Sequence, residues 1–395
     1  MEKLLNLFTS ESVSEGHPDK VCDRISDAIL DACLKEDPLS RTAVETLATR
    51  EKIIISGEVT TKAKVDYEKI ARDVVREIGY TSPEKGIGAD TMSVEVYIRE
   101  QSPDIAQGVN SSFDKHSIGA GDQGIMFGYA TNETENFMPL PIVMAHKLVR
   151  KATELRKAGG LNFARPDMKS QVTIDYTESK PKLNAVVFSC QHEPEFEMSQ
   201  IRDELLTKVI YPVIDSFNLD RNTVDEYYIN PTGRFEIGGP LGDTGLTGRK
   251  IIVDTYGGSA PHGGGAFSGK DPTKVDRSAA YAARHAALNI VAAGLAEKCL
   301  IQLSYAIGVS EPVSINIETY GTENVDKELI LKALLNEDIF DFTPGGIIER
   351  FSLLHPTFRY QDLAAYGHFG RPDLNLPWEK RDKVELLKDY ISKIK

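Results

Sequence analysis

The stretch PDKVCDRISDAILDACL, residues 18–34, opens the pattern that decides the fold. Proline stands at its first position, where a helix needs no backbone N–H donor. Apolar residues then recur at the spacing of one helix face, at Val21, Ile25, Ala28, Ile29, Ala32 and Cys33. The stretch therefore predicts an amphipathic helix whose apolar face packs against a core.

Further elements follow this helix in a definite order. The runs 42–48 and 53–60 are strand-like, and a helix over 66–78 is stopped by Gly79. In the run 92–98 apolar and polar residues alternate, which is typical of a strand with one buried face. The predicted order is helix, strand, strand, helix, strand.

The same order recurs twice more along the chain. The second unit is predicted to have a helix over 139–157, strands near 171–176 and 183–191, a helix over 199–217 and a strand near 226–229. The third has a helix over 272–297, strands at 300–307 and 313–318, and a helix over 325–335, and a last helix over 380–394 closes the chain. The pattern therefore predicts three copies of one α/β unit.

Composition limits the possible partners. The chain has 395 residues with a net charge of −13, and 41% of its residues are apolar and 27% charged. These values are typical of a soluble globular protein, and the length predicts two or three domains at about 150 residues each. Because nucleic acid and anionic membranes both require an excess of Lys and Arg, we expect neither as a partner.

The cysteines and the apolar runs indicate a compartment. The four cysteines, Cys22, Cys33, Cys190 and Cys299, are far apart and form no metal-binding or redox motif. We expect them to be buried thiols in a reducing environment. No apolar run reaches the roughly 18 residues of a membrane-spanning helix, and the N-terminus has no signal-peptide core. A cytoplasmic protein is expected.

The polar, glycine-rich segments between the units are where chemistry is expected, at 101–128, 230–249 and 257–271. Residues 264–271 nearly match a P-loop, but Asp271 stands where that motif needs a hydroxyl. The loop still points backbone amides at an anion, because it leads into a helix N-terminus. Lys270, Lys274 and Arg277 add cations where the helix dipole is already positive, which favours a polyanionic ligand over a solvated basic turn.

Two other glycine motifs do not carry their usual meaning. His262-Gly-Gly-Gly265 is similar to an esterase oxyanion segment, but the chain has no GxSxG nucleophile. Residues 119–124 satisfy GxGxxG yet lead into a strand-like run and not into a helix, so a dinucleotide fingerprint is not expected. Asp122 remains as a carboxylate on a loop.

Two further clusters complete the picture. His17, Asp19 and Lys20 stand at the start of the first helix, where alone they would be a helix cap. Residues 234–250 are again glycine-rich with paired cations. Three basic clusters in an acidic chain are explained together by a nucleoside triphosphate, with Asp19 and Asp276 as oxygen ligands of a bridging magnesium ion.

Three segments are distinctive when taken together: EGHPDK at 15–20, GAGDQG at 119–124 and GGGAFSGKDPTKVDRS at 263–278. They closely resemble the signature segments of methionine adenosyltransferases, also called S-adenosylmethionine synthetases, of the bacterial and eukaryotic type. The resemblance runs from Phe8 to about Trp378. It implies an α/β (α+β) fold of three similar domains related by pseudo-threefold symmetry, each a mixed sheet with helices on one face. The expected domains are 1–103, 118–235 and 236–395.

The resemblance also implies an activity. ATP and L-methionine would form S-adenosylmethionine by in-line attack of the sulfur on C5′, and the tripolyphosphate that leaves would be hydrolysed to pyrophosphate and phosphate. A thioether has no proton to lose, so this step needs no general base. The leaving group's charge must be stabilised, which calls for cations and metal. Two Mg²⁺ ions per site and K⁺ are implied.

Site residues are carried over by position. The catalytic set would be His17, Lys169, Arg249 and Lys270, and further ATP contacts Asp167, Arg234, Phe235, Asp243, Lys250 and Ala266. Methionine would meet Glu58, Gln101, Asp122, Asp243 and Lys274. Asp19 and Asp276 would bind magnesium, and Glu45 potassium. Residues 101–105 are similar to the start of a mobile gating loop, and the family's active site lies between subunits of a dimer of dimers.

Two departures from the family pattern are visible: Arg50-Glu51-Lys52 replaces a glycine-bearing turn, and Met168 stands where a small residue is commoner. Two other functions remain open at this point. A phosphoryl transferase or ATPase would use the same triphosphate pocket and release ADP. A non-enzymatic sensor of ATP or methionine would bind without turnover.

Overall fold

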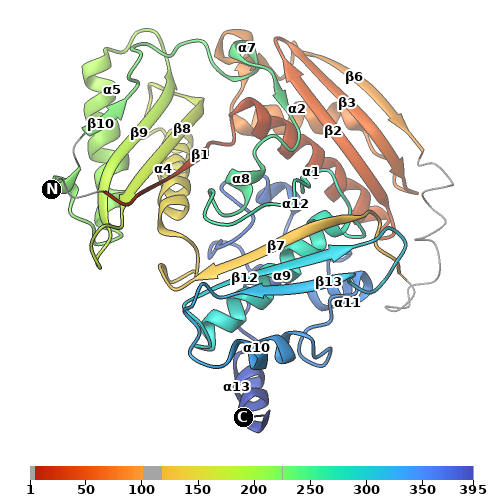
Figure 1. The fold of residues 1–395 in the computed structure, drawn as a ribbon. Coiled ribbons are helices and arrows are strands. Elements are labelled where there is room, and N and C mark those ends of the chain that lie inside the picture. Colours follow the sequence, from red (N-terminus) through yellow and green to blue (C-terminus); the bar gives the residue numbers. More distant parts are fainter. Residues whose placement is uncertain (1–4, 101–117, 225, 395) are drawn as a thin grey trace.

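The structure is a computed structural model that describes residues 5–100, 118–224 and 226–394 (Figure 1). Gln101 and the predicted gating loop that begins there lie outside the described residues. All three predicted units are present, and the mixed α/β class is confirmed.

The first unit has the predicted order. Its elements are α1 (Pro18–Glu36), β2 (Arg41–Thr49), β3 (Lys52–Thr60), α2 (Tyr67–Ile78), the short β4 (Thr81–Ser82), η1 (Pro83–Lys85) and β5 (Ile87–Gly88), and β6 (Ser93–Arg99). Gly79 ends α2 as predicted, with φ of 105° in the left-handed region that glycine adopts readily.

The departure at residues 50–52 leaves the hairpin intact. Arg50 and Glu51 form the turn between β2 and β3, and Thr49 pairs with Lys52. Glu51 has φ of 51°, which is uncommon outside glycine. Its carboxylate accepts hydrogen bonds from the N–H of Gly88 at 2.8 Å and the hydroxyl of Thr91 at 2.7 Å. These tertiary contacts hold the turn without a glycine.

The second unit contains α4 (Leu140–Lys157), β8 (Ala164–Asp175), β9 (Lys182–His192) and β10 (Glu226–Ile229). The helix predicted over 199–217 is α5 (Met198–Leu205), a π-helical turn η2 (Leu206–Ile210) and α6 (Tyr211–Asp215), followed by η3 (Arg221–Thr223). Pro212 has no N–H for the regular helical bond, which explains why the helix changes geometry just before it.

The third unit contains α9 (Val275–Ala292), β12 (Lys298–Tyr305), β13 (Ser314–Glu318) and α10 (Lys327–Leu334). Before it come α7 (Gly239–Gly242), β11 (Gly245–Leu246) and α8 (Ile251–Asp254). After it come α11 (Pro344–Phe351), α12 (Tyr360–Leu363), η4 (Pro377–Glu379) and the predicted last helix, α13 (Val384–Ile394).

Each of the three main sheets takes one strand from another part of the chain. β1 (Leu7–Val13) pairs with β8 in the order β1-β8-β9-β10, β11 pairs with β2 in the order β11-β2-β3-β6, and β7 (Gly124–Thr131) pairs with β12 in the order β13-β12-β7. The first two sheets are mixed, since β6 and β10 run parallel to their neighbours. The described strands of the third sheet are all antiparallel, so the mixed sheet expected in each unit is found only in the other two.

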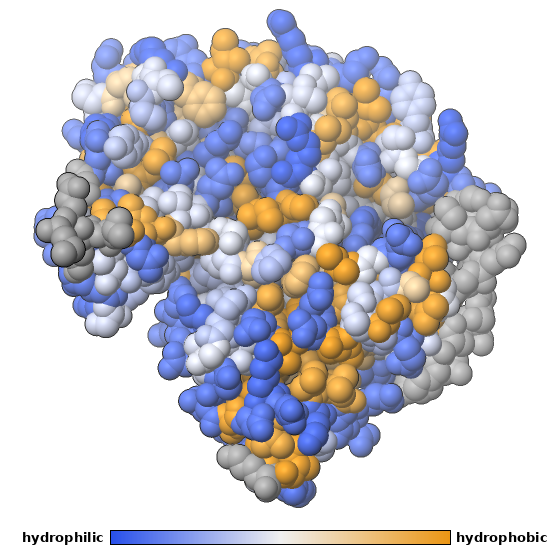
Figure 2. Space-filling view, in the orientation of Figure 1, coloured by the Kyte–Doolittle hydropathy of each residue, from blue (hydrophilic) through white to orange (hydrophobic). Residues whose placement is uncertain are grey.

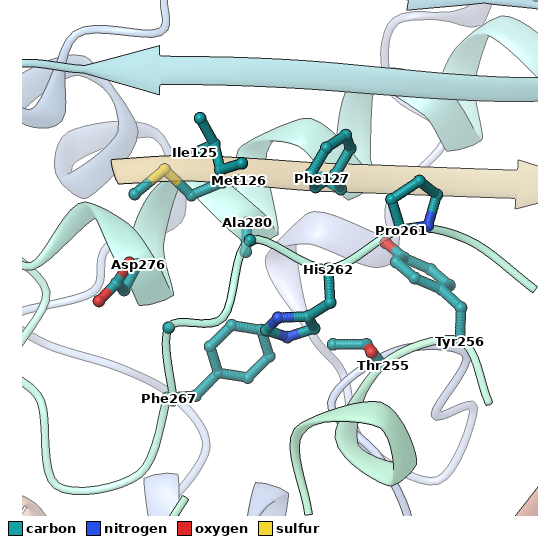
Figure 3. Close-up of a pocket in the computed structure, with 12 residues that line it drawn as sticks. Ile125, Met126, Phe127, Thr255, Tyr256, Pro261, His262, Phe267, Asp276 and Ala280 are labelled. Atoms are coloured by element: carbon teal, nitrogen blue, oxygen red, sulfur yellow. The ribbon is translucent and has the colours of Figure 1, made fainter. Parts of the chain in front are cut away.

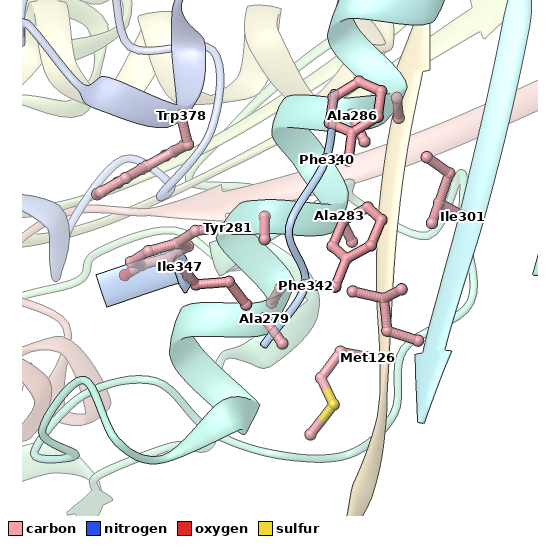
Figure 4. Packing of buried hydrophobic residues seen from close by; sticks show 14 of the residues in the cluster. Met126, Ala279, Tyr281, Ala283, Ala286, Ile301, Phe340, Phe342, Ile347 and Trp378 are labelled. Carbon is pink, nitrogen blue, oxygen red and sulfur yellow. The ribbon is translucent and has the colours of Figure 1, made fainter. Parts of the chain in front are cut away.

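The sheets surround a centre filled by helices (Figure 1). α1, α4 and α9 pack on the inner faces of their sheets and form three hydrophobic cores. The largest core surrounds the alanine-rich α9, with Met126 and Ile301 of the sheet on one side and Tyr281 and Trp378 on the other (Figure 4). The Tyr281 and Trp378 rings stack with centroids 3.9 Å apart.

The close packing of α9 on its sheet depends on Gly128 of β7. A Cβ atom at this position would lie 2.0 Å from the carbonyl carbon of Ala283. Helix and strand backbones therefore touch directly. No helix in the described parts of the chain is long and apolar enough to cross a membrane.

Candidate active site

His17 and Asp19 stand where β1 has ended and α1 begins. The Nδ1 atom of His17 accepts the N–H of Asp19 at 3.2 Å, which caps the helix. Gly16 makes the turn possible, because a Cβ atom there would lie 2.4 Å from the carbonyl oxygen of Pro166. Asp19 accepts the N–H of Leu246 at 3.0 Å and the ammonium of Lys250 at 2.5 Å. Both site residues are almost completely buried.

His17 and Asp19 differ in their charge at neutral pH. Burial, and after it the charges of the nearby Lys250 and Lys169, lower the pKa of His17 to about 3. Burial raises the pKa of Asp19, but hydrogen bonds from Lys250 and from the Leu246 N–H more than offset that effect and lower it. At neutral pH, His17 is therefore a neutral imidazole beside an ionised carboxylate and two lysines.

β8 contributes Asp167 and Lys169. Asp167 is buried, and its Oδ2 atom accepts the N–H of Gly239 at 2.9 Å. Its Oδ1 atom has no partner among the described residues. Burial raises the pKa of Asp167 to about 6. Met168, between the two, points into the core of the second unit and is fully buried, so this departure does not reach the site.

Arg249 and Lys250 lie on the loop that follows β11. Gly248 donates its N–H to Asp23 of α1 at 2.8 Å, and Thr247 donates its N–H to the carbonyl of Thr46 at 3.0 Å. The Nε atom of Arg249 is 3.9 Å from Oδ1 of Asp19. The loop thus carries both cations to the start of α1.

Lys270 lies on a second loop, residues 263–271, which also packs on β2. Val44 donates its N–H to the carbonyl of Gly269 at 3.1 Å, and Asp271 donates to Thr42 at 3.2 Å. The Nζ atom of Lys270 is 2.6 Å from Oδ2 of Asp276, in the first turn of α9.

Lys274 and Asp122 lie near this second loop. The Nζ atom of Lys274 is 2.6 Å from Oδ2 of the buried Asp271. Asp122 follows Gly121, whose N–H is donated to the carbonyl of Thr273 at 3.1 Å. Both predicted methionine contacts are therefore close to the start of α9.

Asp276 and His262 line a small cavity between β7 and the 263–271 loop (Figure 3). Its volume is about 10 Å³, which is room for one water molecule. The Nδ1 atom of His262 accepts the N–H of Gly264 at 2.8 Å, and burial lowers the pKa of this histidine. This cavity is too small for a nucleotide.

The strand register sets the direction of Lys270. Lys270 pairs with Ala43 of β2, and Ala43 pairs with Glu58 of β3. Side chains of paired residues lie on the same face, so Lys270 and Glu58 share the exposed face of the first sheet with Glu45. α1 covers the opposite face.

The predicted residues therefore fall into two groups. The His17 group contains His17, Asp19, Asp167, Lys169, Arg249 and Lys250, and the Lys270 group contains Glu45, Glu58, Asp122, Lys270, Lys274 and Asp276. In the described ranges, no hydrogen bond or ion pair joins a member of one group to a member of the other. The loops themselves touch, since a Cβ atom at Gly248 would lie 2.5 Å from Cβ of Ala266.

Three predicted residues lie on the segment that leads to the Arg249 loop. Arg234 donates to the carbonyl of Pro194 at 2.9 Å. Phe235 donates its N–H to Nε2 of His192 at 3.0 Å. Asp243 accepts the N–H of Thr244 at 2.9 Å and raises the pKa of Asp167 through its charge.

Sequence reasoning missed Asp23 and Asp27, which are fully buried on α1 and bond to the two cationic loops. The signal was present, because Asp19, Asp23, Asp27 and Asp31 recur every fourth residue. Such a spacing aligns side chains on one helix face. Buried carboxylates in a row require partners from elsewhere in the chain.

Comparisons with known proteins point in one direction. Three family models match: the S-adenosylmethionine synthetase N-terminal domain over residues 5–103, the central domain over 117–235 and the C-terminal domain over 237–380. A curated relative from Mesoplasma florum, described as S-adenosylmethionine synthase, is 58% identical over 383 residues. That similarity covers 97% of this chain and 99% of the relative.

Proposed function

The chain belongs to the S-adenosylmethionine synthetase family and forms S-adenosylmethionine from ATP and L-methionine, and from that premise we propose how its residues share the work. In this proposal, the His17 group of one chain and the Lys270 group of a second chain together bind the triphosphate. The observation that supports it is that, among the described residues of one chain, no hydrogen bond or ion pair joins the predicted cations of one group to members of the other.

The reaction sets the tasks of these residues. The methionine sulfur attacks C5′ of ATP in line, and the tripolyphosphate leaves as a unit before it is hydrolysed to pyrophosphate and phosphate. No proton is removed from the thioether, so no general base is needed in this step. The negative charge that develops on the leaving oxygen must be stabilised by fixed donors.

His17 is suited to the leaving oxygen. Its imidazole is neutral because of burial and the neighbouring lysines, and a neutral ring can still donate one hydrogen bond to an anion. Lys169, Arg249, Lys250 and Lys270 supply the positive charge around the phosphates. Fixed cations in a partly buried site stabilise a developing anion without rearrangement.

Enzymes of this family need metal ions, and the carboxylates present fit magnesium. Asp19 and Asp276 offer oxygen ligands, and in the described residues no group of three His, Cys, Asp or Glu side chains converges on one point. Magnesium is commonly held by one or two carboxylates together with substrate phosphates. We therefore propose that Asp19 and Asp276 hold two Mg²⁺ ions that screen the triphosphate charge, and that Glu45 binds K⁺.

The remaining residues are proposed to contact the two substrates. Arg234, Phe235, Asp167 and Ala266 would bind the nucleoside, and the unpartnered Oδ1 atom of Asp167 is available for a donor on it. Methionine would meet Glu58, Asp122, Asp243, Lys274 and Gln101. Of these, Glu58, Asp122 and Asp243 are exposed in the single chain, as residues that await a ligand or a second subunit would be.

A homo-oligomer, a dimer of dimers, completes the proposal. Glu45 and Glu58 face outward on the first sheet. Ile125 of the third sheet is 42% exposed, and Val313, directly before β13, is 66% exposed. Figure 2 shows apolar residues gathered on this side of the molecule. We also infer a cytoplasmic location, which the four free, buried cysteines support.

The experiment that tests the proposal identifies the products by mass. The purified chain is incubated with ATP, methionine, MgCl₂ and KCl, and a matched sample lacks methionine. We expect S-adenosylmethionine, pyrophosphate and phosphate, formed only with methionine. ADP as the product would indicate a phosphoryl transferase instead, and binding without turnover would indicate a sensor. The division between chains is tested by mixing an inactive His17→Ala chain with an inactive Lys270→Ala chain, which should restore activity.

A further inference from the structure

The four aspartates of α1 form a row that we call the acidic face of α1: Asp19, Asp23, Asp27 and Asp31. Each accepts hydrogen bonds from a backbone N–H on a distant segment, namely Leu246, Gly248, Gly269, and Tyr360 with Gln361. Leu246 and Gly248 lie on the segment that carries Arg249 and Lys250, and Gly269 lies on the loop that carries Lys270. One helix face therefore holds both cationic loops.

Asp27 fixes the backbone next to Lys270. Its Oδ1 atom accepts the N–H of Gly269 at 2.9 Å and Nη1 of Arg277 at 2.7 Å, and its Oδ2 atom accepts Nη2 of Arg277 at 2.9 Å. The same Arg277 donates to the carbonyl of Lys270 at 3.2 Å. Lys270 is thus held through the N–H before it and through its own carbonyl.

Gly269 has little freedom to move within this arrangement. Its carbonyl accepts hydrogen bonds from the N–H of Val44 at 3.1 Å and from the hydroxyl of Thr42 at 3.0 Å. A Cβ atom on Gly269 would lie 2.0 Å from the carbonyl oxygen of Val44. The segment is clamped between β2 on one side and Asp27 on the other.

Asp23 does the same for the other loop. Its Oδ1 atom accepts the N–H of Gly248 at 2.8 Å, directly before Arg249 and Lys250, and its Oδ2 atom accepts Nζ of Lys20 at 2.9 Å. Lys20 also bonds to Asp254. Ser26 lies between the two aspartates and contacts the hydroxyls of Thr46 and Thr247, both at 2.9 Å.

A single rigid element therefore sets the distance between the two loops. Asp23 and Asp27 are one helical turn apart, or about 6 Å along the axis. The two loops also lie along one edge of β2, the first at Thr46 and the second at Thr42 and Val44. Because α1 and β2 both bind the two loops, they fix the position of one loop relative to the other.

We propose that Asp23 and Asp27 are positioning residues: Asp23 holds the loop of Arg249 and Lys250, and Asp27 holds the loop of Lys270, each in the position in which its cations meet a triphosphate shared with a second chain. This inference rests on the proposed roles of those cations. Neither aspartate touches the substrate. Each acts through a backbone N–H next to a cation. A displacement of about 1 Å at reacting groups can reduce turnover by about 10².

Asp31 offers a matched control on the same helix face. It accepts the N–H groups of Tyr360 at 2.8 Å and Gln361 at 2.9 Å, and neither belongs to a cationic loop. Replacing Asp31 removes backbone hydrogen bonds of the same kind from the same helix, but Asp31 forms no ion pair with a described residue. It therefore controls for the loss of those backbone hydrogen bonds.

The test compares Asp27→Asn, Asp23→Asn and Asp31→Asn in the full chain. Thermal melts measure the stability of each variant. Initial rates, taken at a temperature well below all three melting points, give kcat and the KM values for ATP and methionine. Calorimetry with inorganic tripolyphosphate gives the Kd of that ligand. For Asp27→Asn and Asp23→Asn we expect kcat to fall and the tripolyphosphate Kd to rise, each by about tenfold or more, with the methionine KM within about threefold. Asp31→Asn should keep kcat and Kd within about twofold.

The outcomes separate the possible failures. If Asp27→Asn and Asp23→Asn lose stability but keep the wild-type kcat and tripolyphosphate Kd, the positioning role is wrong. An equal loss in Asp31→Asn also overturns it. If Asp27→Asn does not fold because Arg277 loses its partner, Asp23→Asn decides, since Lys20 keeps Asp254. Activity that is unaffected by Lys270→Ala would instead refute the proposed site.

Discussion

The Nζ atom of Lys270 lies 2.6 Å from Oδ2 of Asp276. The first residue is proposed to contact the phosphates and the second to bind magnesium, and here each neutralises the other. A magnesium-bound triphosphate offers both residues a stronger partner. Binding would therefore exchange an ion pair within the protein for two contacts to the ligand.

Lys270→Ala should leave the fold intact and lower turnover by about 10² to 10³, the usual loss for one electrostatic donor to a transition state. Initial rates and a thermal melt measure both quantities. Lys332→Ala, on the exposed side of α10, is the matched control and should retain full activity. Near-normal turnover of Lys270→Ala would contradict its assignment.

His17→Ala should slow the formation of S-adenosylmethionine more than the hydrolysis of added tripolyphosphate. The imidazole is expected to act on the oxygen that leaves C5′, and that bond is already broken in tripolyphosphate. Parallel assays of the two reactions give the ratio of rates. Equal slowing of both would argue against a role specific to the leaving oxygen.

Acid should destabilise the protein through buried neutral histidines. Burial lowers the pKa of His146 to about 3, and its Nδ1 atom lies 2.7 Å from Oγ of Ser12. Between pH 6.5 and 3 the unfolded state binds a proton that the folded state does not, so stability falls as pH falls through this range. The loss from one such histidine is about 2 kcal/mol at pH 5.

Urea unfolding at several pH values between 7 and 5 measures this effect. The variant His146→Gln should show a shallower dependence of unfolding free energy on pH, by about one proton. His17 has a similarly lowered pKa of about 3, so part of the dependence should remain. An unchanged slope in the variant would mean that His146 does not carry the effect.

Gly128→Ala should destabilise the third unit. The added methyl group would meet the backbone of Ala283, which cannot rotate away as a side chain can. We expect a loss of about 1–3 kcal/mol or more in unfolding free energy. Gly160→Ala is the control, because its nearest neighbour would be a flexible Leu155 side-chain atom at 3.2 Å. Equal stability of the two variants would show that β7 and α9 can separate at little cost.

Local sequence pattern predicted most of the elements of this fold. The periodicity of residues 18–34 predicted α1, and the alternation over 92–98 predicted the strand β6. The buried face expected for that strand is not fully present, because Val96 is 40% exposed. Gly79 ended α2 where expected. Strand pairing could not be predicted in the same way. Nothing in residues 7–13 says that they pair with β8, about 160 residues later.

For the candidate site too, the sequence predicted individual residues but not how they are grouped in space. The motifs identified His17, Asp19, Lys270 and Asp276, but not which of them would lie together. Their grouping depends on the β2 edge, where two distant loops bind next to each other. The aspartates at 23 and 27 escaped notice because a row of carboxylates on a helix usually faces solvent. Only the packing of the loops reveals that they are buried.

In each of the three main sheets one strand comes from another part of the chain, and this affects how the protein folds during its synthesis. β7 ends at Thr131 and pairs with β12, whose first residue is Lys298. At 5–20 residues per second, a ribosome needs roughly 10 to 30 s to synthesise the residues between them. During that time β7 emerges with an unpaired edge, which invites association with other nascent chains. We expect the yield of native enzyme in cells to depend on chaperones that cover this strand during synthesis.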